Sequence, residues 1–348
     1  MDKIKIYRYK YFFPESLQKL AYGGIIPNIK KNPLLLFQVP FFVFFQLVSM
    51  TKIISKEKID VIHSHWIIPQ GFCGAIIKKI HKKKHLMTIH AGGIFALKKL
   101  PFKRAVANFI VKNCDAITVV SSLNKKVLLE IISPNLRKNT EEKIKILPMG
   151  VSVKGFKKKS EEDKKELNIL FIGRLAEKKG VKYLLDAMPK VFAEKPMTRL
   201  FIAGDGPLKE KLEKQVKELK ITENVVFEGY VSGKNKLNAF SKADLVVVPS
   251  IIDKLGDQEG MPVTVLEGFA SGSPVIASNV GGIADVIDNG INGFLVEQKN
   301  SNQIAEKILL LINSPNLRRK LRINALNTIK KYDWKEIGKK YYSLITSL

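Results

Sequence analysis

The chain has 348 residues, 45% hydrophobic and 26% charged, a composition typical of soluble globular proteins and a length that favours about two domains. Its two cysteines, Cys73 and Cys114, exclude a disulfide framework and indicate a reducing, cytoplasmic setting. The net charge is +27, of which residues 1–150 carry +18 and residues 151–348 carry +9. This excess favours phosphates, nucleic acid or an anionic membrane surface as partners, although lysine on every solvated face would also explain much of it.

The first half of the chain predicts strands that end in polar or glycine residues. Residues 2–15, "DKIKIYRYKYFFPE", are typical of a later strand of a parallel sheet, so we expect the first βαβ portion of this domain to be missing. The clearer apolar runs follow further along the chain, and each suits a strand buried on both faces. They cover residues 58–66, 84–93, 114–122 and 144–152.

Residues 33–50, "PLLLFQVPFFVFFQLVSM", are dense in Phe and Leu. Gln38, Pro40 and Gln46 interrupt the run, and a spanning helix needs about 20 apolar residues in sequence, so we do not expect a membrane span. A helix buried in the first domain is the favoured interpretation. The alternative is a helix that touches the bilayer interface, with nearby lysines on anionic lipid.

The second half alternates apolar runs with helical patterns, which predicts a parallel sheet covered on both faces. The charged stretch 154–168 is the expected interdomain linker. We therefore predict an α/β protein of two Rossmann-like domains that face each other across a cleft: residues 1–152 plus 331–348, and residues 153–330. The strands of the second domain are expected at residues 167–173, 198–204, 224–229, 244–250, 274–278 and 293–297.

Two basic residues follow the first of these strands in "FIGRLAEKKG". Arg174 comes directly after Gly173, and Lys179 precedes the glycine that opens the next helix. Arg binds phosphate through parallel N–H donors and Lys adds a point charge, so this pair can hold a diphosphate. A solvated basic loop would have the same local sequence.

Two carboxylates frame an apolar stretch in "DQEGMPVTVLEGFASGSPVIAS". Pro262 suits a first helical turn, so Glu259 is expected just before the helix and Glu267 about a turn and a half into it. Carboxylates accept hydrogen bonds from the hydroxyls of sugars and riboses. The helix start adds backbone amides that bind a phosphate or a hydroxyl.

Together, "FIGRLAEKKG", "IAGDGP", "EGMPVTVLE" and "GGIADVIDNGINGFLV" resemble the retaining glycosyltransferases of family four, which have the GT-B fold. Glu259 and Glu267 match the Glu-x7-Glu motif of that family, and the resemblance covers roughly residues 58–348. The sequence is also similar in places to family members that assemble polysaccharides or lipid-linked glycans.

The resemblance implies roles for individual residues of this chain. Arg174 and Lys179 would bind the donor diphosphate, Glu259 the hydroxyls of the donor sugar and Glu267 the ribose. His90, at the end of "MTIH", would lie close to the transferred sugar. Further donor-binding positions are Gly173, Gly260, Met261, Tyr230 and Val231, and the acceptor side would include His63 and His65.

The expected activity is retaining, metal-independent transfer of a hexosyl unit from a nucleotide-diphosphate sugar to a glycan or lipid-linked acceptor. No Asp-x-Asp motif is present, and no cofactor is expected beyond the nucleotide-sugar co-substrate. The alternatives are a sugar-nucleotide epimerase or phosphorylase of the same fold, or an inactive truncated homologue. A dehydrogenase lacks its G-x-G-x-x-G here, and no nucleic-acid-binding signature supports a nucleic-acid partner. We expect a cytoplasmic protein, peripheral on the inner face of the plasma membrane.

Overall fold

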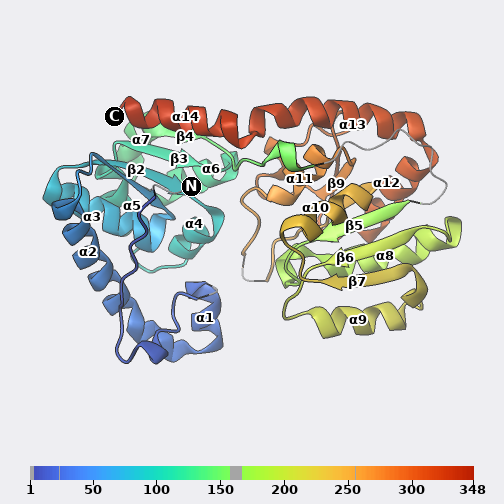
Figure 1. The fold of residues 1–348 in the computed structure, drawn as a ribbon, viewed down its shortest axis with the longest axis horizontal. Helices are drawn as coiled ribbons and strands as arrows, with labels where there is room; N and C mark the ends of the chain where they lie inside the picture. The colour runs from blue at the N-terminus through green and yellow to red at the C-terminus, as the bar shows by residue number, and fades with distance from the viewer. Residues whose placement is uncertain (1–3, 23, 157–166, 255) are drawn as a thin grey trace. The chain divides into compact units, whose positions relative to one another are not determined.

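A computed structural model describes residues 4–22, 24–156, 167–254 and 256–348 (Figure 1). The chain forms two compact units, the first from Met1–Val119, Lys125–Lys145 and Ser347–Leu348, the second from Val120–Asn124 and Ile146–Thr346. The prediction of an interdomain linker at residues 154–168 falls largely on residues 157–166, which lie outside the described residues.

Residues 331–346 group with the second unit, whereas the sequence led us to expect residues 331–348 in the first domain. Backbone hydrogen bonds explain the difference. The amide of Val151 donates to the carbonyl of Tyr332, and the amide of Trp334 donates to the carbonyl of Val151, each pair with donor and acceptor 3.0–3.1 Å apart. Tyr332 is also buried in a core of the second unit. These contacts join residues 331–346 to the unit that begins at Ile146.

The first unit is built on a four-stranded sheet in the order β1-β2-β3-β4. Strands β1 and β2 pair in parallel, and so do β2 and β3, as the sequence predicted. The strands are β1 (Val61–His65), β2 (Lys84–Ile89), β3 (Ala116–Val119) and β4 (Ile144–Ile146). The helices are α1 (Ile25–Lys31), α2 (Gln38–Lys56), α3 (Phe72–His81), α4 (Ala91–Lys98), α5 (Lys103–Lys112), α6 (Ser122–Ile131), whose first three residues group with the second unit, and α7 (Pro134–Lys143), with short helical turns at Glu15–Leu17, Pro33–Phe37 and Ile67–Gly71.

Two predictions for the start of the chain are wrong. Residues 4–14 form no strand, and the segment is instead fixed by side chains such as Tyr11, whose hydroxyl accepts hydrogen bonds from the amides of Leu20 and Ala21. Helix α2 is not a core helix, because only Gln38 and Phe42 are buried along it. Its apolar side chains exceed what the small cluster around Tyr11 can cover.

The second unit contains a six-stranded sheet in the order β10-β9-β8-β5-β6-β7, with every pair parallel. Each strand lies within a predicted apolar run. The strands are β5 (Asn168–Ile172), β6 (Arg199–Ala203), β7 (Val225–Gly229), β8 (Leu245–Val248), β9 (Val275–Ser278) and β10 (Phe294–Val296). The helices are α8 (Val181–Glu194), α9 (Lys209–Glu218), α10 (Gly233–Lys242), α11 (Val263–Ser271), α12 (Ser301–Asn313), α13 (Pro315–Ile329) and α14 (Trp334–Thr346).

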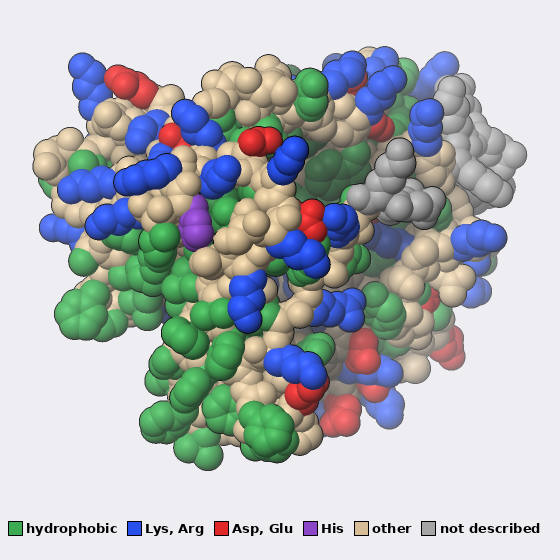
Figure 2. Space-filling model, turned by 60° about the vertical axis from the view of Figure 1, so that its left-hand side comes forward, with side chains coloured by type: hydrophobic (Ala, Val, Ile, Leu, Met, Phe, Trp, Pro, Cys, Tyr) green, Lys and Arg blue, Asp and Glu red, His purple; other side chains and the backbone are tan. Residues whose placement is uncertain are grey.

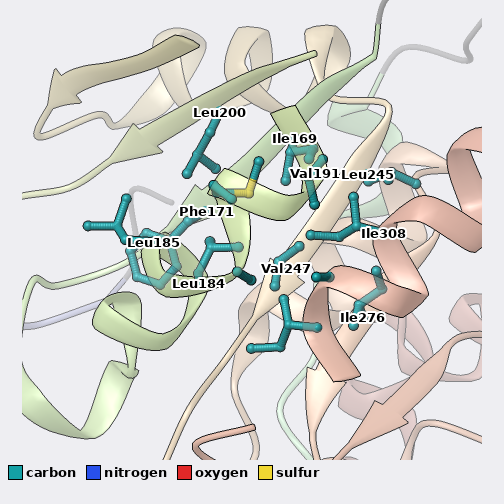
Figure 3. Packing of buried hydrophobic residues seen from close by; sticks show 14 of the residues in the cluster. Ile169, Phe171, Leu184, Leu185, Val191, Leu200, Leu245, Val247, Ile276 and Ile308 are labelled. Atoms are coloured by element: carbon teal, nitrogen blue, oxygen red, sulfur yellow. The ribbon is translucent and has the colours of Figure 1, made fainter. Parts of the chain in front are cut away.

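Alternate residues of each strand point to opposite sides of the sheet. Helices cover both sides, so both faces of the sheet are buried. Ile169 and Phe171 of β5 pack with helices α8 and α12, and Figure 3 shows this core. Leu170 and Ile172 belong to a second core on the other face, with residues of α10, α11 and α13. Burial on two faces accounts for the continuous apolar runs in the sequence and fixes the central strands, whose loops carry the candidate site.

The turn at Gly180 is required by a close backbone approach. Its φ is +65°, and a Cβ at this position would lie 1.8 Å from the carbonyl oxygen of Pro249. We therefore expect Gly180→Ala to lower the free energy of unfolding by about 2–4 kcal/mol, from the left-handed conformation together with the clash. Chemical denaturation would measure this loss.

Gly233 provides the matched control, because its φ is +51° and no atom lies within 4 Å of an added Cβ. Gly233→Ala should cost only the conformational part, about 1 kcal/mol. Equal losses in the free energy of unfolding for the two variants would show that the Pro249 loop moves aside freely. That outcome would contradict the requirement for glycine at position 180 by close backbone approach.

Candidate functional site

The order of the sheet in the second unit defines where a ligand would bind. The chain leaves β5 toward β6 and β7 on one side, and it continues through β8 toward β9 and β10 on the other. β5 and β8 are neighbours in the sheet, so the order reverses between them. Open parallel sheets bind ligands outside the carboxyl ends of the strands at such a switch point. The loops after β5 and β8 carry Lys179 and Glu259.

These two loops are attached to each other. The amide of Ile251 donates to the carbonyl of Lys178 at 2.8 Å, and Gly180 lies against Pro249 as described above. Lys178 Nζ lies 3.2 Å from Asp257 Oδ2, which adds a side-chain pair between the loops. The loop after β5 therefore holds its lysines directly over the loop that carries Glu259.

Glu259 is a buried carboxylate, 9% exposed, and Lys179 is its charged partner. Lys179 Nζ lies 2.9 Å from Glu259 Oε1. The angles at this contact do not meet hydrogen-bond geometry, so within the described residues Oε1 accepts no hydrogen bond although it is buried. We regard the contact as an ion pair, since charge attraction depends on distance more than on angle. The oxygen keeps its capacity to accept a hydrogen bond from a hydroxyl.

A glycine after β9 fixes the backbone of Glu259. The φ of Gly281 is +64°, and a Cβ there would lie 2.0 Å from the carbonyl oxygen of Glu259. Three loops, after β5, β8 and β9, thus converge on this one residue. The convergence explains how a loop carboxylate can be held in a buried position.

Glu267 lies inside helix α11 and is also buried, 8% exposed. Its Oε1 forms an ion pair with the ammonium of Lys236 from helix α10. Pro262 is the N-cap of α11, and the helix begins at Val263, one residue later than the sequence suggested. The two motif carboxylates are therefore neutralised by two different lysines, which come from different elements.

The other predicted donor residues differ in their surroundings. Arg174 is exposed and forms no ion pair within the described part of the chain, whereas Gly260 and Met261 are buried beside Glu259. Gly173 follows β5, and its amide donates to the carbonyl of Ala203. Tyr230 and Val231 follow β7 at the edge of the sheet, where Tyr230 is largely exposed and Val231 packs against a core. The structure thus brings Lys179, Glu259, Gly260 and Met261 together and leaves Tyr230 two strands away from β5.

In the first unit the three predicted histidines form one cluster. His65 Nδ1 and His90 Nε2 are 3.1 Å apart, and the ring centroids of His63 and His65 are 4.3 Å apart. His63 Nε2 lies 2.8 Å from the hydroxyl of Thr88, which in turn bonds the hydroxyl of Thr118. His63 and His65 alternate along β1, so they share one face of the strand. The strand register places His65 opposite Thr88 on β2, one residue before the strand end and two before His90.

This cluster is held in its uncharged form. Burial, with smaller contributions from the neighbouring imidazoles, lowers the pKa of His63 to about 4. Burial lowers the pKa of His90 to about 4, with a smaller contribution from the neighbouring His65 ring, since protonating both rings would bring like charges together. The pKa of His65 is also lowered by burial against these rings, although its side chain keeps contact with solvent. At neutral pH these rings can therefore both donate and accept hydrogen bonds.

Several residues that contact the candidate site residues were not predicted from the sequence. The ring centroids of Trp66 and His90 are 5.5 Å apart with the ring planes tilted by 36°, and the Thr88 hydroxyl forms a hydrogen bond with His63. The period-two pattern "HSHW" and a parallel register with "MTIH" would have indicated Thr88. No local signal identifies Lys236, which pairs with Glu267 from a different helix.

No three His, Cys, Asp or Glu side chains are grouped so as to hold a metal ion in residues 4–22, 24–156, 167–254 and 256–348. This finding concerns the protein's own ligands only. The cations of the site within these ranges are lysine and arginine side chains.

Comparisons with known proteins agree with this architecture. Residues 153–328 match the family model of glycosyl transferases group 1, and residues 7–154 match that of glycosyltransferase family 4. The two matches overlap at residues 153–154. The chain belongs to the family-four glycosyltransferases, and its fold is GT-B, with two parallel-sheet Rossmann-like domains.

Individual relatives cover most of the chain. An uncharacterised glycosyltransferase of Methanocaldococcus jannaschii is 31% identical over 307 residues, which are 82% of this chain and 75% of the relative. The N-acetyl-alpha-D-glucosaminyl L-malate synthase of Bacillus anthracis is 26% identical, over 91% of this chain and 82% of the relative. The crystal structure of Anabaena HepE in complex with UDP superposes with a TM-score of 0.72 at 18% identity, over 86% of this chain and 82% of that one.

The lowered histidine pKa values predict a pH-dependent stability. Between about pH 6.5 and pH 4 the unfolded chain binds protons that the folded His63 and His90 do not, so stability is lost as the pH falls through this window. We expect the free energy of unfolding to fall by about 1 kcal/mol per histidine between pH 7 and pH 5, after allowance for partial exposure. Denaturation followed by Trp66 fluorescence in a Trp334→Phe background would measure it.

His90→Gln should remove part of this dependence and leave the stability near pH 8 closer to that of the unmodified protein. An unchanged slope between pH 7 and pH 5 in His90→Gln would contradict the burial of a neutral His90.

Proposed function

We propose that this protein transfers a hexosyl unit, with retention of the anomeric configuration, from a nucleotide-diphosphate sugar to a glycan or lipid-linked acceptor in cell-surface polysaccharide assembly. The family membership supports sugar transfer. The structural observation that supports the proposal most directly is the buried Lys179–Glu259 pair at the switch point of the second unit's sheet. The UDP complex of HepE, a protein of the same fold, is consistent with a nucleotide donor.

The second unit offers separate groups for the parts of such a donor. Lys179 is held beside Glu259 by charge attraction, and its ammonium N–H donors can reach a diphosphate. Arg174, exposed at the end of β5, adds a planar fork of donors. The amides at the start of α11 point toward the same edge and favour negative charge. Glu259 accepts from a sugar hydroxyl, and Glu267 accepts from a ribose hydroxyl.

The reaction breaks the bond between the anomeric carbon and a phosphate oxygen and forms a bond between that carbon and an acceptor oxygen. Negative charge develops on the leaving diphosphate, and fixed cations stabilise it where it forms. In the proposed front-face route the acceptor's proton passes to the leaving phosphate oxygen, so no protein nucleophile is required. The neutral imidazole of His90 in the first unit can exchange hydrogen bonds with sugar hydroxyls.

Glu259→Gln tests the assignment of the carboxylate. The substitution keeps the shape but removes the charge that strengthens a hydrogen bond from a hydroxyl, so we expect kcat/KM to fall by about tenfold to a hundredfold. Initial rates with a panel of nucleotide-diphosphate sugars, and circular dichroism to confirm the fold, are the measurements. Glu306→Gln, an exposed site on α12, is the control and should keep full activity. Full activity of Glu259→Gln would contradict the proposal.

Arg174→Ala and Lys179→Ala test the diphosphate site. Each is expected to cost about 2–4 kcal/mol of transition-state stabilisation, comparable to the loss of one oxyanion donor. Arg174→Ala is the cleaner variant, because Arg174 is exposed and has no ion pair among the described residues, whereas Lys179→Ala also leaves Glu259 without its cation. Lys182→Ala, exposed on α8, is the matched control.

The same assays with EDTA test the metal-independent form of the proposal. Since lysine and arginine supply the positive charge in it, activity should change little when divalent ions are removed. Strict dependence on a divalent ion would overturn that part while leaving the transfer of sugar intact.

A further inference from the structure

Exposed apolar side chains are concentrated at the start of the chain. Half of the large hydrophobic side chains that are exposed in the described residues lie between residues 4 and 45. Figure 2 shows hydrophobic side chains gathered over one part of this surface, where few charged side chains interrupt them. A soluble protein rarely exposes a contiguous apolar surface of this kind without a partner for it.

The most regular part of this surface lies on helix α2. Phe41, Phe44 and Phe45 on α2, and Phe37, which directly precedes its first residue, are exposed, with exposed fractions from 39% to 75%. Phe37, Phe41 and Phe44 are spaced by four and three residues, and Phe45 adjoins Phe44, so the four side chains lie on one side of the helix, which we call the aromatic face. Lys52 follows on the same face eleven residues after Phe41, and it is also exposed.

The opposite side of α2 is attached to the first unit. The ring of Phe42 lies 5.1 Å from that of Tyr11 in a small buried cluster. Gln38 Nε2 donates to the carbonyl of Leu17 at 2.7 Å, and Cys73 Sγ on α3 lies 3.5 Å from Gln46 Oε1. The helix is therefore fixed to the protein by one side, and its aromatic face points away from that side.

The charge around the aromatic face is of one sign. Residues 16–56 contain five lysines and no aspartate or glutamate. The lysines are exposed, and they are Lys19, Lys30, Lys31, Lys52 and Lys56. Lysines near an anionic bilayer contribute about 1 kcal/mol each, and phenylalanine on the apolar face of an interfacial helix is buried at the boundary between headgroups and acyl chains.

We propose that the aromatic face of α2 is a docking surface for an anionic lipid bilayer, with the helix in the plane of the interface and its rings at the acyl boundary. The biological role of this docking rests on the proposed function, because binding to the bilayer would bring the transferase to a lipid-linked acceptor. Residues Pro33–Lys56 are long and apolar enough to cross a membrane, and 17% of their most apolar 18-residue stretch is buried. The contacts of Gln38, Phe42 and Gln46 fix one side of the helix to the protein and favour the interfacial arrangement over a spanning one.

The test is flotation of the full chain with vesicles of phosphatidylcholine alone or with about 30% phosphatidylglycerol, at low and high salt. We expect binding to the anionic vesicles that weakens as salt rises. The triple variant Phe37→Ser, Phe41→Ser, Phe44→Ser should lower the partition coefficient about tenfold or more, since it removes apolar area that the bilayer would bury.

Phe102→Ser is the matched control. Phe102 is 76% exposed, against 75% for Phe37, and it belongs to the same unit but lies outside residues 4–56. Its replacement should leave vesicle binding unchanged. Equal losses for the triple variant and for Phe102→Ser would overturn the assignment of the aromatic face, as would the absence of binding to any vesicle.

Two further measurements test two alternatives to this bilayer surface, which are a second copy of the chain on the aromatic face and a membrane-spanning helix. Sedimentation of the free protein would show a dimer that the triple variant converts to a monomer if a second copy covered the aromatic face, and this outcome would overturn the proposal. Retention by membranes after alkaline carbonate washing would indicate a spanning helix and would also overturn it. Stabilisation by nucleotide-diphosphate sugars, measured by thermal shift without vesicles, tests the proposed function independently.

Discussion

The second unit depends on one constraint, which is that a carboxylate on a loop has to be held in a buried position. An unpaired buried charge is costly, so Glu259 requires a cation and a rigid backbone around it. Lys179 supplies the cation at 2.9 Å, and Gly281 allows the loop after β9 to approach the Glu259 carbonyl. The same constraint explains why Gly180 packs against Pro249, because only a close approach of these loops brings Lys179 over the carboxylate.

The parts of the structure that local sequence determines were predictable. Burial on both faces gives continuous apolar strands, and helices between them require a parallel sheet, so the six strands of the second unit follow from "LNILFIG", "TRLFIAG" and their successors. The spacing of Glu259 and Glu267 and the position of Lys179 after β5 were likewise readable. Side-chain pairs between separate elements were not, because no fixed spacing links Lys236 to Glu267 or Lys178 to Asp257. These pairs exist only once the sheet order brings the helices and loops together.

The start of the chain shows a different limit. An apolar helix pattern indicates that a side chain avoids water, but not whether protein or lipid replaces the water. Phe42 and Phe41 are adjacent and chemically identical, yet Phe42 is buried against Tyr11, while Phe41 touches only the edge of this region through Phe12 and remains 49% exposed. The favoured interpretation of residues 33–50 as a core helix was therefore wrong for most of its side chains, and the amount of core available in the first unit decided the matter.

The two units also differ in how they use charge. The candidate donor site needs few cations, and those of the second unit are largely matched by acids, as Lys179 with Glu259 and Lys236 with Glu267 show. The histidine cluster of the first unit is neutral, so it adds nothing to the excess charge at pH 7. The net +18 of residues 1–150 is consequently carried by lysines and arginines that no part of the donor chemistry requires, and most of those in the described residues are exposed. Because five of these lysines, with no acidic residue among them, accompany the exposed aromatic face in residues 16–56, an anionic apolar surface accounts for both features there, whereas a soluble acidic partner would account only for the charge.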